Sequence, residues 1–193
     1  CWGNPAFGPL DAVTYHALIR ATRPRRIVEV GGGFSTMVAA RAALLNGDVE
    51  VTCLDPFPAP ALRDGFPGLA RLVVEPVQTA PLDVFEALEP GDMLFIDSSH
   101  ISKTGSDVNH LLFECLPRVR SGVLVHFHDI HLPWDYPKEL LLERGVYWNE
   151  QYALLAVLLG NPAIQIVQAN RYLAHHHGEA IGRRFPFLPI RSG

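Results

Sequence analysis

Short apolar runs alternate with helix-type spacing along most of the chain, and this alternation restricts the fold more than any other sequence feature. The apolar runs predict strands at 26–30, 51–54, 72–74, 93–96, 123–127 and 164–167. Apolar residues three and four apart predict helices at 10–21, 35–46, 81–88, 108–116 and 148–159. Strands that alternate with helices form β-α-β units, because parallel neighbours must be joined by a long crossover. The sequence therefore predicts an α/β fold: a doubly wound, mostly parallel sheet with helices on both faces.

Length, charge and the first residue narrow the class of protein. The 193 residues suit one domain, so we take 1–193 as a single domain. The chain opens with Cys1 rather than Met, and we expect it to be a fragment of a longer protein. A net charge of −4 argues against a nucleic-acid partner, since phosphate binding needs clustered Lys and Arg. Neither a membrane-spanning apolar run nor a signal peptide is present, which predicts a cytoplasmic protein without a membrane partner.

A glycine-rich turn follows the first predicted strand, within the run Glu-Val-Gly-Gly-Gly-Phe-Ser-Thr at 29–36. Ligands of open parallel sheets bind beyond the carboxyl ends of the strands, which is where this turn lies. Its glycines let the backbone turn sharply and bring N–H groups close to a ligand at a helix N-terminus. Glu29 puts a carboxylate in an apolar strand, which is costly unless it accepts hydrogen bonds from the turn or a ligand. Ser35 and Thr36 are able to cap the helix that follows.

A second acidic residue ends the next predicted strand. Asp55 stands where an acidic side chain can bind both hydroxyls of a ribose, although a simple turn at Asp55-Pro56 is the alternative. The dinucleotide-binding fingerprint requires a third small residue where this chain has Thr36. This mismatch argues against NAD as the ligand.

Three runs together resemble a known family. The glycine turn with Glu29, Asp55, and the run Asp-Met-Leu-Phe-Ile-Asp-Ser-Ser-His at 92–100 resemble the class I S-adenosylmethionine-dependent methyltransferases. Segments 95–107, 125–130 and 148–152 resemble a bacterial branch of that group, of mostly undefined substrate and related to small-molecule O-methyltransferases. The resemblance implies a Rossmann-like methyltransferase fold. The family sheet ends in an antiparallel strand, for which only the Pro-rich 184–190 remains, so we expect that strand to be missing or to come from residues beyond this sequence.

The same resemblance assigns candidate cofactor-binding positions. It implies that the glycine turn surrounds the methionine part of S-adenosylmethionine, that Asp55 binds the ribose, and that Val77 and Gln78 lie beside the adenine. The full set of cofactor-binding candidates is Glu29, Gly31, Gly32, Gly33, Ser35, Thr36, Asp55, Pro56, Val77, Gln78, Asp97 and Ser98.

Acidic residues and histidines gather after the fourth and fifth predicted strands. Asp97 and Asp129 end these strands, and His100 follows Asp97 by three residues. Related sugar and catechol O-methyltransferases hold magnesium at corresponding places, which here are Asp97, His128 and Asp129. Imidazole is a poor magnesium ligand and suits a softer metal, so a divalent metal and a metal-free site both stay open. His126, on the fifth predicted strand, is expected to be a buried, hydrogen-bonded core residue.

These features predict an S-adenosylmethionine-dependent methyltransferase that methylates the hydroxyl of a small-molecule acceptor. His100 is the expected general base, with Asp129 or a bound metal lowering the pKa of the acceptor. The resemblance also implies an acceptor pocket after the fifth strand, for which the candidates are Trp134, Tyr136, Trp148 and Glu150, with simple packing of the aromatic rings as the alternative. His175 to His177 are expected on the surface. Two alternatives stay open: a nicotinamide-dependent oxidoreductase using the same turn, and a non-catalytic cofactor-binding subunit. Whether the protein forms a homo-oligomer also stays open.

Overall fold

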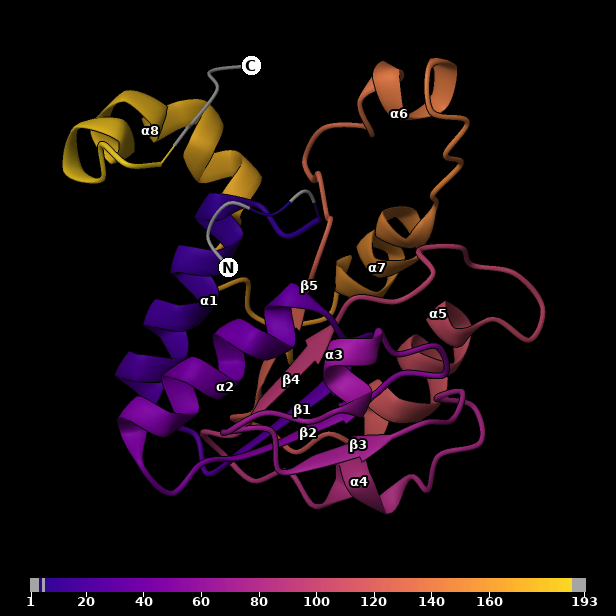
Figure 1. Ribbon diagram of the computed structural model, residues 1–193. Helices are drawn as coiled ribbons and strands as arrows, with labels where there is room; N and C mark the ends of the chain where they lie inside the picture. Colours follow the sequence, from indigo (N-terminus) through magenta and orange to yellow (C-terminus); the bar gives the residue numbers. More distant parts are fainter. Residues whose placement is uncertain (1–3, 5, 189–193) are drawn as a thin grey trace.

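The computed structural model describes residues 4 and 6–188, and a five-stranded sheet lies at its centre (Figure 1). The strands are β1 (Arg26–Val30), β2 (Glu50–Leu54), β3 (Arg71–Val73), β4 (Met93–Ile96) and β5 (Leu124–Phe127). Their order across the sheet is β3-β2-β1-β4-β5, and every neighbouring pair is parallel. The chain order reverses between β1 and β4, which confirms the predicted doubly wound α/β fold and places a switch point at these two strands.

Helices cover both faces of the sheet. They are α1 (Pro9–Thr22), α2 (Phe34–Asn46), α3 (Pro60–Arg63), α4 (Asp83–Glu86), α5 (Asp107–His110), α6 (Lys138–Leu142), α7 (Glu150–Leu158) and α8 (Asn170–Arg184). Helices α1 and α2 pack on one face through a core that includes Tyr15 and Phe95. On the other face Phe85 of α4 and Leu111, just after α5, enter a second core. Successive residues of a strand serve opposite cores, as Leu94 and Phe95 do, because strand side chains alternate in direction.

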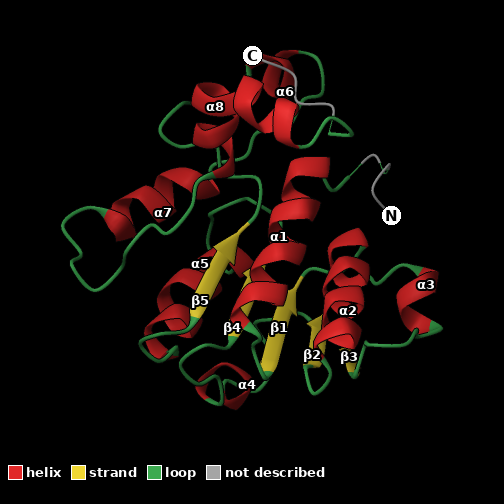
Figure 2. Ribbon diagram, turned by 90° about the vertical axis from the view of Figure 1, so that its left-hand side faces the viewer, coloured by secondary structure: helices red, strands yellow, loops and turns green. Residues whose placement is uncertain are grey.

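The strand register places the candidate residues at one edge of the sheet. Val30 pairs with Leu54 on β2 and with Ile96 on β4, and Ile96 pairs with Phe127 on β5. The residues that come next in the chain, Gly31, Asp55, Asp97 and His128, therefore leave the sheet side by side. Figure 2 shows the strand arrows pointing toward this edge, with α6 and α8 on the same side of the molecule.

The predicted strand at 164–167 is wrong. These residues belong to no strand, and Ile166 and Val167 are 70% and 75% exposed. β-branched residues favour a strand only where a neighbouring strand supplies hydrogen bonds and packing, and in the described chain β5 pairs with β4 alone. Residues 184–188 form no strand either, so the expected antiparallel strand is missing from the part of 184–190 that the structure describes; 189–190 lie outside it.

Helix boundaries also differ from the sequence pattern. The helix predicted at 81–88 is reduced to α4, and the one predicted at 108–116 changes from α5 to a π-helical turn at Leu111–Cys115. Helix α8 is not predicted at all; none of its residues is fully buried, and its half-buried face includes small residues such as Ala174, Gly178 and Gly182. Within residues 6–188 no helix combines the length and apolar character needed to cross a membrane.

Candidate active site

The first glycine of the turn is required by the fold itself. Gly31 has φ +81°, and a Cβ at this position would lie 1.8 Å from the carbonyl oxygen of Asp97. Its N–H donates to the Leu54 carbonyl at 2.8 Å, so the turn is held between β2 and β4. Only glycine combines this backbone angle with such a close approach. The predicted need for a positive φ in the turn is confirmed at Gly31.

The other two glycines differ in what surrounds them. A Cβ at Gly32 would lie 2.5 Å from Cys53 Sγ, whereas a Cβ at Gly33 would meet no described atom within 4 Å. The N–H of Gly33 donates to Thr36 Oγ1 at 3.0 Å, so Thr36 caps the start of α2 as predicted. Nothing in the described protein therefore demands a glycine at Gly33, and the space beside it is open to a ligand.

Asp55 lies directly against this turn. Its Oδ2 accepts the Gly32 N–H at 3.0 Å, and its Oδ1 accepts the Phe57 N–H at 2.7 Å. The structure thus brings Asp55 and the glycine turn together, as the sequence predicts. Both oxygens are anchored by backbone donors and keep further lone pairs, since each carboxylate oxygen can accept two hydrogen bonds.

Glu29 is fully buried in β1, and one of its oxygens has no partner. Ser35 Oγ donates to Oε1, while Oε2 has no hydrogen bond to any described residue. Burial raises the pKa of Glu29 to about 8, although the Ser35 hydrogen bond acts in the opposite direction. The predicted hydrogen bond from the turn to Glu29 is confirmed, and its donor is Ser35. The Ser35 hydroxyl therefore binds Glu29 and does not cap α2. An unpaired buried oxygen at this place is the kind of atom that a bound ligand would satisfy.

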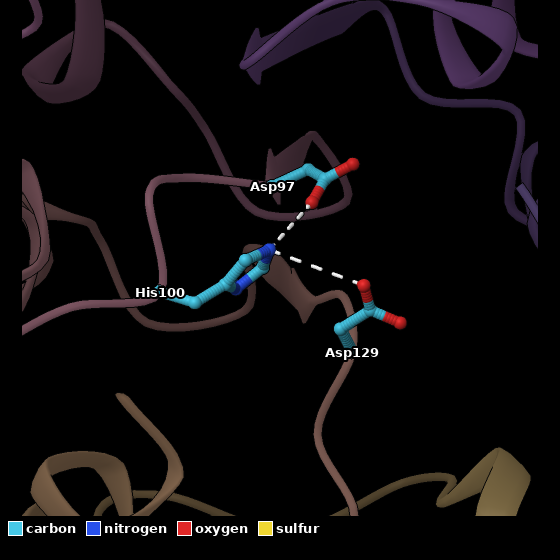
Figure 3. Close-up of side chains that lie close together, drawn as sticks. All are labelled: Asp97, His100 and Asp129. Atoms are coloured by element: carbon cyan, nitrogen blue, oxygen red, sulfur yellow. Dashed lines mark ion pairs between the residues drawn. The ribbon is translucent and has the colours of Figure 1, made fainter. Parts of the chain in front are cut away.

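Asp97, His100 and Asp129 form a second group beside the turn (Figure 3). His100 Nε2 lies 3.1 Å from Asp97 Oδ1 and 4.0 Å from Asp129 Oδ2. One potential ligand atom from each residue lies within 4.8 Å of those of the other two, and we call this set the Asp–His–Asp group. His100 (φ +58°) and Asp129 (φ +53°) both adopt the left-handed backbone region, which is uncommon outside glycine and concentrates at functional sites.

Helix α7 supplies a partner that the sequence did not assign to His100. Glu150 Oε2 lies 2.7 Å from His100 Nδ1, and Glu150 Oε1 accepts a hydrogen bond from Ser98 Oγ at 3.2 Å. Glu150 is 1% exposed and His100 5%. The backbone N–H groups of Asn149 and Glu150 both donate to the His100 carbonyl, and the Trp148 ring lies 4.4 Å from the imidazole. The sequence marked Glu150 only as an acceptor-pocket candidate, since nothing local indicates which residue its carboxylate meets.

Opposing effects set the protonation of this group. Burial alone would lower the pKa of His100, but hydrogen bonds with Asp97 and Glu150 raise it to about 10. Burial alone would raise the pKa of Asp97, but His100 and His128 hold it well below its usual range. Burial raises the pKa of Asp129. Without a ligand, His100 is therefore a positively charged imidazolium, protonated on both ring nitrogens, at neutral pH.

His128 is buried next to the same carboxylates. It is 4% exposed; its Nδ1 lies 3.4 Å from Asp97 Oδ1 and 3.6 Å from Asp129 Oδ2, and its Nε2 lies 3.9 Å from Asp11 Oδ2. Neither ring nitrogen forms a hydrogen bond of acceptable geometry with the described residues. The acidic residues and histidines that the sequence places after the fourth and fifth predicted strands are thus brought together at Asp97, His100, His128 and Asp129. His126 is half-buried rather than fully buried as expected; its ring packs against those of Tyr15 and Phe95, and burial lowers its pKa to about 4.

Comparison with known proteins decides the family. Residues 28–130, more than half of the chain, match the family model described as a methyltransferase domain, and this segment runs from β1 to just after β5. The chain belongs to this methyltransferase domain family. An uncharacterized protein from Archaeoglobus fulgidus is 41% identical over 90 residues, which are 45% of this chain and 41% of that relative. The match thus spans less than half of the relative's length.

Three further cofactor-binding candidates of the methyltransferase domain differ in their exposure. The Val77 side chain is buried in the core with Phe85, which leaves Gln78 as the exposed member of the pair. Gln78 Nε2 donates to the Gly105 carbonyl at 3.1 Å. Pro56 is half-buried beside Asp55.

The acceptor-pocket candidates separate into two kinds. Tyr136 is buried, and its ring packs against His131 and Trp148. Trp134 is 38% exposed, and its ring lies 4.6 Å from that of His175 on α8. The expectation that His175 to His177 are on the surface is confirmed, although α8 brings two of them against Trp134. Trp134 is therefore the most exposed of the three aromatic candidates, since Trp148 is half-buried and Tyr136 buried.

Proposed function

We propose that this methyltransferase domain binds S-adenosylmethionine at the glycine turn and transfers its methyl group to the hydroxyl of a small acceptor. The observation that carries the proposal is the contact between Gly31 and Asp97. A cofactor held by the turn lies next to the Asp–His–Asp group, because the first glycine of the turn abuts the carbonyl of the residue that begins the group.

The residues of the turn fit the cofactor. Open space beside Gly33 leaves room for the ligand, and the unpaired Oε2 of Glu29 can form a hydrogen bond with a ligand or a water molecule. Asp55 keeps lone pairs for the two ribose hydroxyls. In this role the three residues bind and orient the ligand rather than react with it.

The proposed reaction is an in-line displacement. S-adenosylmethionine supplies an electrophilic methyl group, and its C–S bond breaks as the bond from the acceptor oxygen to the methyl carbon forms. The protein then has to align the acceptor, exclude water and receive the hydroxyl proton. Asp97, His100 and Asp129 are the polar groups that lie beside the turn and can hold that hydroxyl. That His100 receives the proton stays a prediction, and it requires that the histidine first give up the proton it carries.

Family membership favours this function over the two alternatives that the sequence leaves open. A nicotinamide-dependent oxidoreductase shares only the turn, whereas the family match extends through the Asp–His–Asp group. A thermal-shift experiment separates the possibilities, since a ligand that binds the folded state raises the melting temperature. We expect stabilisation by S-adenosylmethionine and by S-adenosylhomocysteine, and none by NADH. Stabilisation by NADH alone would overturn the proposal.

Turnover tests the remaining alternative, a non-catalytic cofactor-binding subunit. Incubation with methyl-labelled S-adenosylmethionine and a panel of phenols, catechols and sugars should yield a labelled acceptor. The label should appear on oxygen. Tight cofactor binding together with label transfer to nitrogen or carbon acceptors only would contradict O-methylation and leave the methyltransferase assignment in place.

A further inference from the structure

We propose that the Asp–His–Asp group binds one divalent first-row transition-metal ion, with His100 Nε2 as a ligand and Glu150 as the residue that orients it. This inference rests on the proposed function only in its location, since it concerns the residues beside the same glycine turn. It differs from the metal set that the family resemblance implies, in which His128 would be the histidine ligand and magnesium the metal.

The spacing of the three ligand atoms suits a small cation. Ligands bound at about 2.1 Å and at angles between 90° and 109° lie roughly 3.0–3.4 Å apart. His100 Nε2 and Asp97 Oδ1 are already 3.1 Å apart. Asp129 Oδ2 lies 4.0 Å from Nε2 and has to come closer to share the ion, and its side chain is 36% exposed. Two carboxylates also neutralise the double charge of the ion.

Glu150 gives His100 the second contact that metal-bound histidines typically have. Such a histidine donates its other ring N–H to a carboxylate or carbonyl, which fixes the tautomer and the ring plane. Here Nδ1 lies 2.7 Å from Glu150 Oε2, so a neutral His100 carries its proton on Nδ1 and presents the lone pair of Nε2 to the two aspartates. Ser98 holds the other oxygen of Glu150, and Trp148 packs on the ring.

His128 provides an independent indication of a missing ligand. Its side chain is more than nine-tenths buried, both ring nitrogens lack a hydrogen bond to the described residues, and Nδ1 points at the same two carboxylates. Buried polar atoms are nearly always paired. A water molecule bound to a cation between Asp97 and Asp129 would give Nδ1 its partner without making His128 a ligand.

The ligand types select the class of metal. Magnesium prefers oxygen ligands and keeps much of its water, whereas imidazole binds manganese, iron, cobalt and zinc increasingly well. Such an ion would lower the pKa of a coordinated acceptor hydroxyl. His100 then acts as a ligand in place of the direct base that the sequence predicts, because the one lone pair of Nε2 cannot bind both a metal and an incoming proton.

Metal binding is measured without any substrate. We expect the purified full chain, freed of metal by dialysis against EDTA, to bind one Mn²⁺ by calorimetry, and to bind Zn²⁺ at least tenfold more tightly than Mg²⁺. Pulsed electron paramagnetic resonance of the Mn²⁺ form should show a directly coordinated nitrogen. Failure of both Mn²⁺ and Zn²⁺ to bind, or Mn²⁺ bound without a coordinated nitrogen, would overturn the proposal.

Variants identify the nitrogen and the orienting residue. His100→Gln should abolish the nitrogen signal, and Glu150→Gln should weaken Zn²⁺ binding by ~10–100-fold while the nitrogen signal persists. His128→Gln should leave the signal in place; its loss in this variant alone would give the ligand role to His128 and contradict ours. Glu179→Gln, an exposed carboxylate on α8, is the matched control. Far-ultraviolet circular dichroism checks each fold, and Asp97→Asn with Asp129→Asn replaces His100→Gln if that variant does not fold.

The same samples separate this inference from the proposed function. S-adenosylhomocysteine binding is measured in EDTA, where no metal is bound. Retained cofactor binding without metal binding overturns the metal site alone. Metal binding without cofactor binding overturns the methyltransferase proposal and leaves the metal site standing.

Discussion

His100 and Glu150 are 50 residues apart in the chain, yet their side chains form a buried pair with Nδ1 2.7 Å from Oε2. The pair joins the loop after β4 to the first residue of α7, and backbone N–H groups from that helix start donate to the His100 carbonyl. The helix thereby holds His100 in its left-handed conformation, with Nε2 facing Asp97 and Asp129.

Replacing Asp55 should weaken cofactor binding without unfolding the domain. For Asp55→Ala we expect the affinity for S-adenosylhomocysteine to fall roughly tenfold or more, because a hydrogen bond to a charged group contributes about 1.5–3 kcal/mol. Isothermal calorimetry measures the change. Asp64→Ala, an exposed carboxylate just after α3, is the control. Equal affinities in both variants would remove Asp55 from the cofactor site.

Two glycines of the same turn should respond in opposite ways. Gly31→Ala should lower the free energy of unfolding by more than about 1 kcal/mol, since the new Cβ meets the Asp97 carbonyl at a positive φ. Gly33→Val should leave the melting temperature nearly unchanged yet abolish S-adenosylhomocysteine binding, because no described atom fills the space beside it and the ligand is proposed to bind there. Urea unfolding and calorimetry are run on both. A Gly33→Val protein that binds the cofactor normally would contradict the proposed position of the ligand.

Glu29 should make the stability of the domain depend on pH. Its pKa is about 8 in the folded protein, against an ordinary value of 4.5, so the folded state holds a proton that the unfolded state releases. The free energy of unfolding contributed by this group is therefore fully present below about pH 4.5 and is lost as the pH rises toward 8.

The isosteric variant Glu29→Gln isolates this effect. The amide keeps an acceptor oxygen for Ser35 but does not titrate in this range. Urea unfolding at pH 5, 6.5 and 8 should show the wild type losing more stability than the variant. If the free energy of unfolding changes with pH equally in the wild type and the variant, the pKa of Glu29 is not raised in the folded protein.

Chelation should distinguish the two roles considered for His100. His100→Ala should reduce turnover by ~10²–10⁴-fold whether the residue is a base or a metal ligand, so this variant alone decides little. Incubation with EDTA should abolish turnover of the wild-type protein, and added Mn²⁺ or Zn²⁺ should restore it. Full activity in EDTA, with His100→Ala still inactive, would return His100 to the role of direct base.

Local patterns were sufficient to predict the sheet and the residues at its edge. Five runs of apolar residues became parallel strands, because strands buried on both faces need nearly continuous apolar sequence. Once parallel strands are recognised, their carboxyl ends must share one edge. The positions of Gly31, Asp55, Asp97 and Asp129 at that edge follow from the sequence alone.

Tertiary structure alone decided which side chains meet and which segments find a partner. The run at 164–167 has the composition of a strand, but strand formation requires a neighbour, and the described chain provides none. Glu150 lies far from His100 in sequence, so no local pattern could pair them. Likewise, the sequence places His100 and His128 near the same two aspartates and does not indicate how their rings are oriented. The loop after β4 turns the Nε2 of His100 toward both carboxylates. His128, directly after β5, is buried with both ring nitrogens unpaired. This difference depends on how α7 and α1 pack around the ends of the strands.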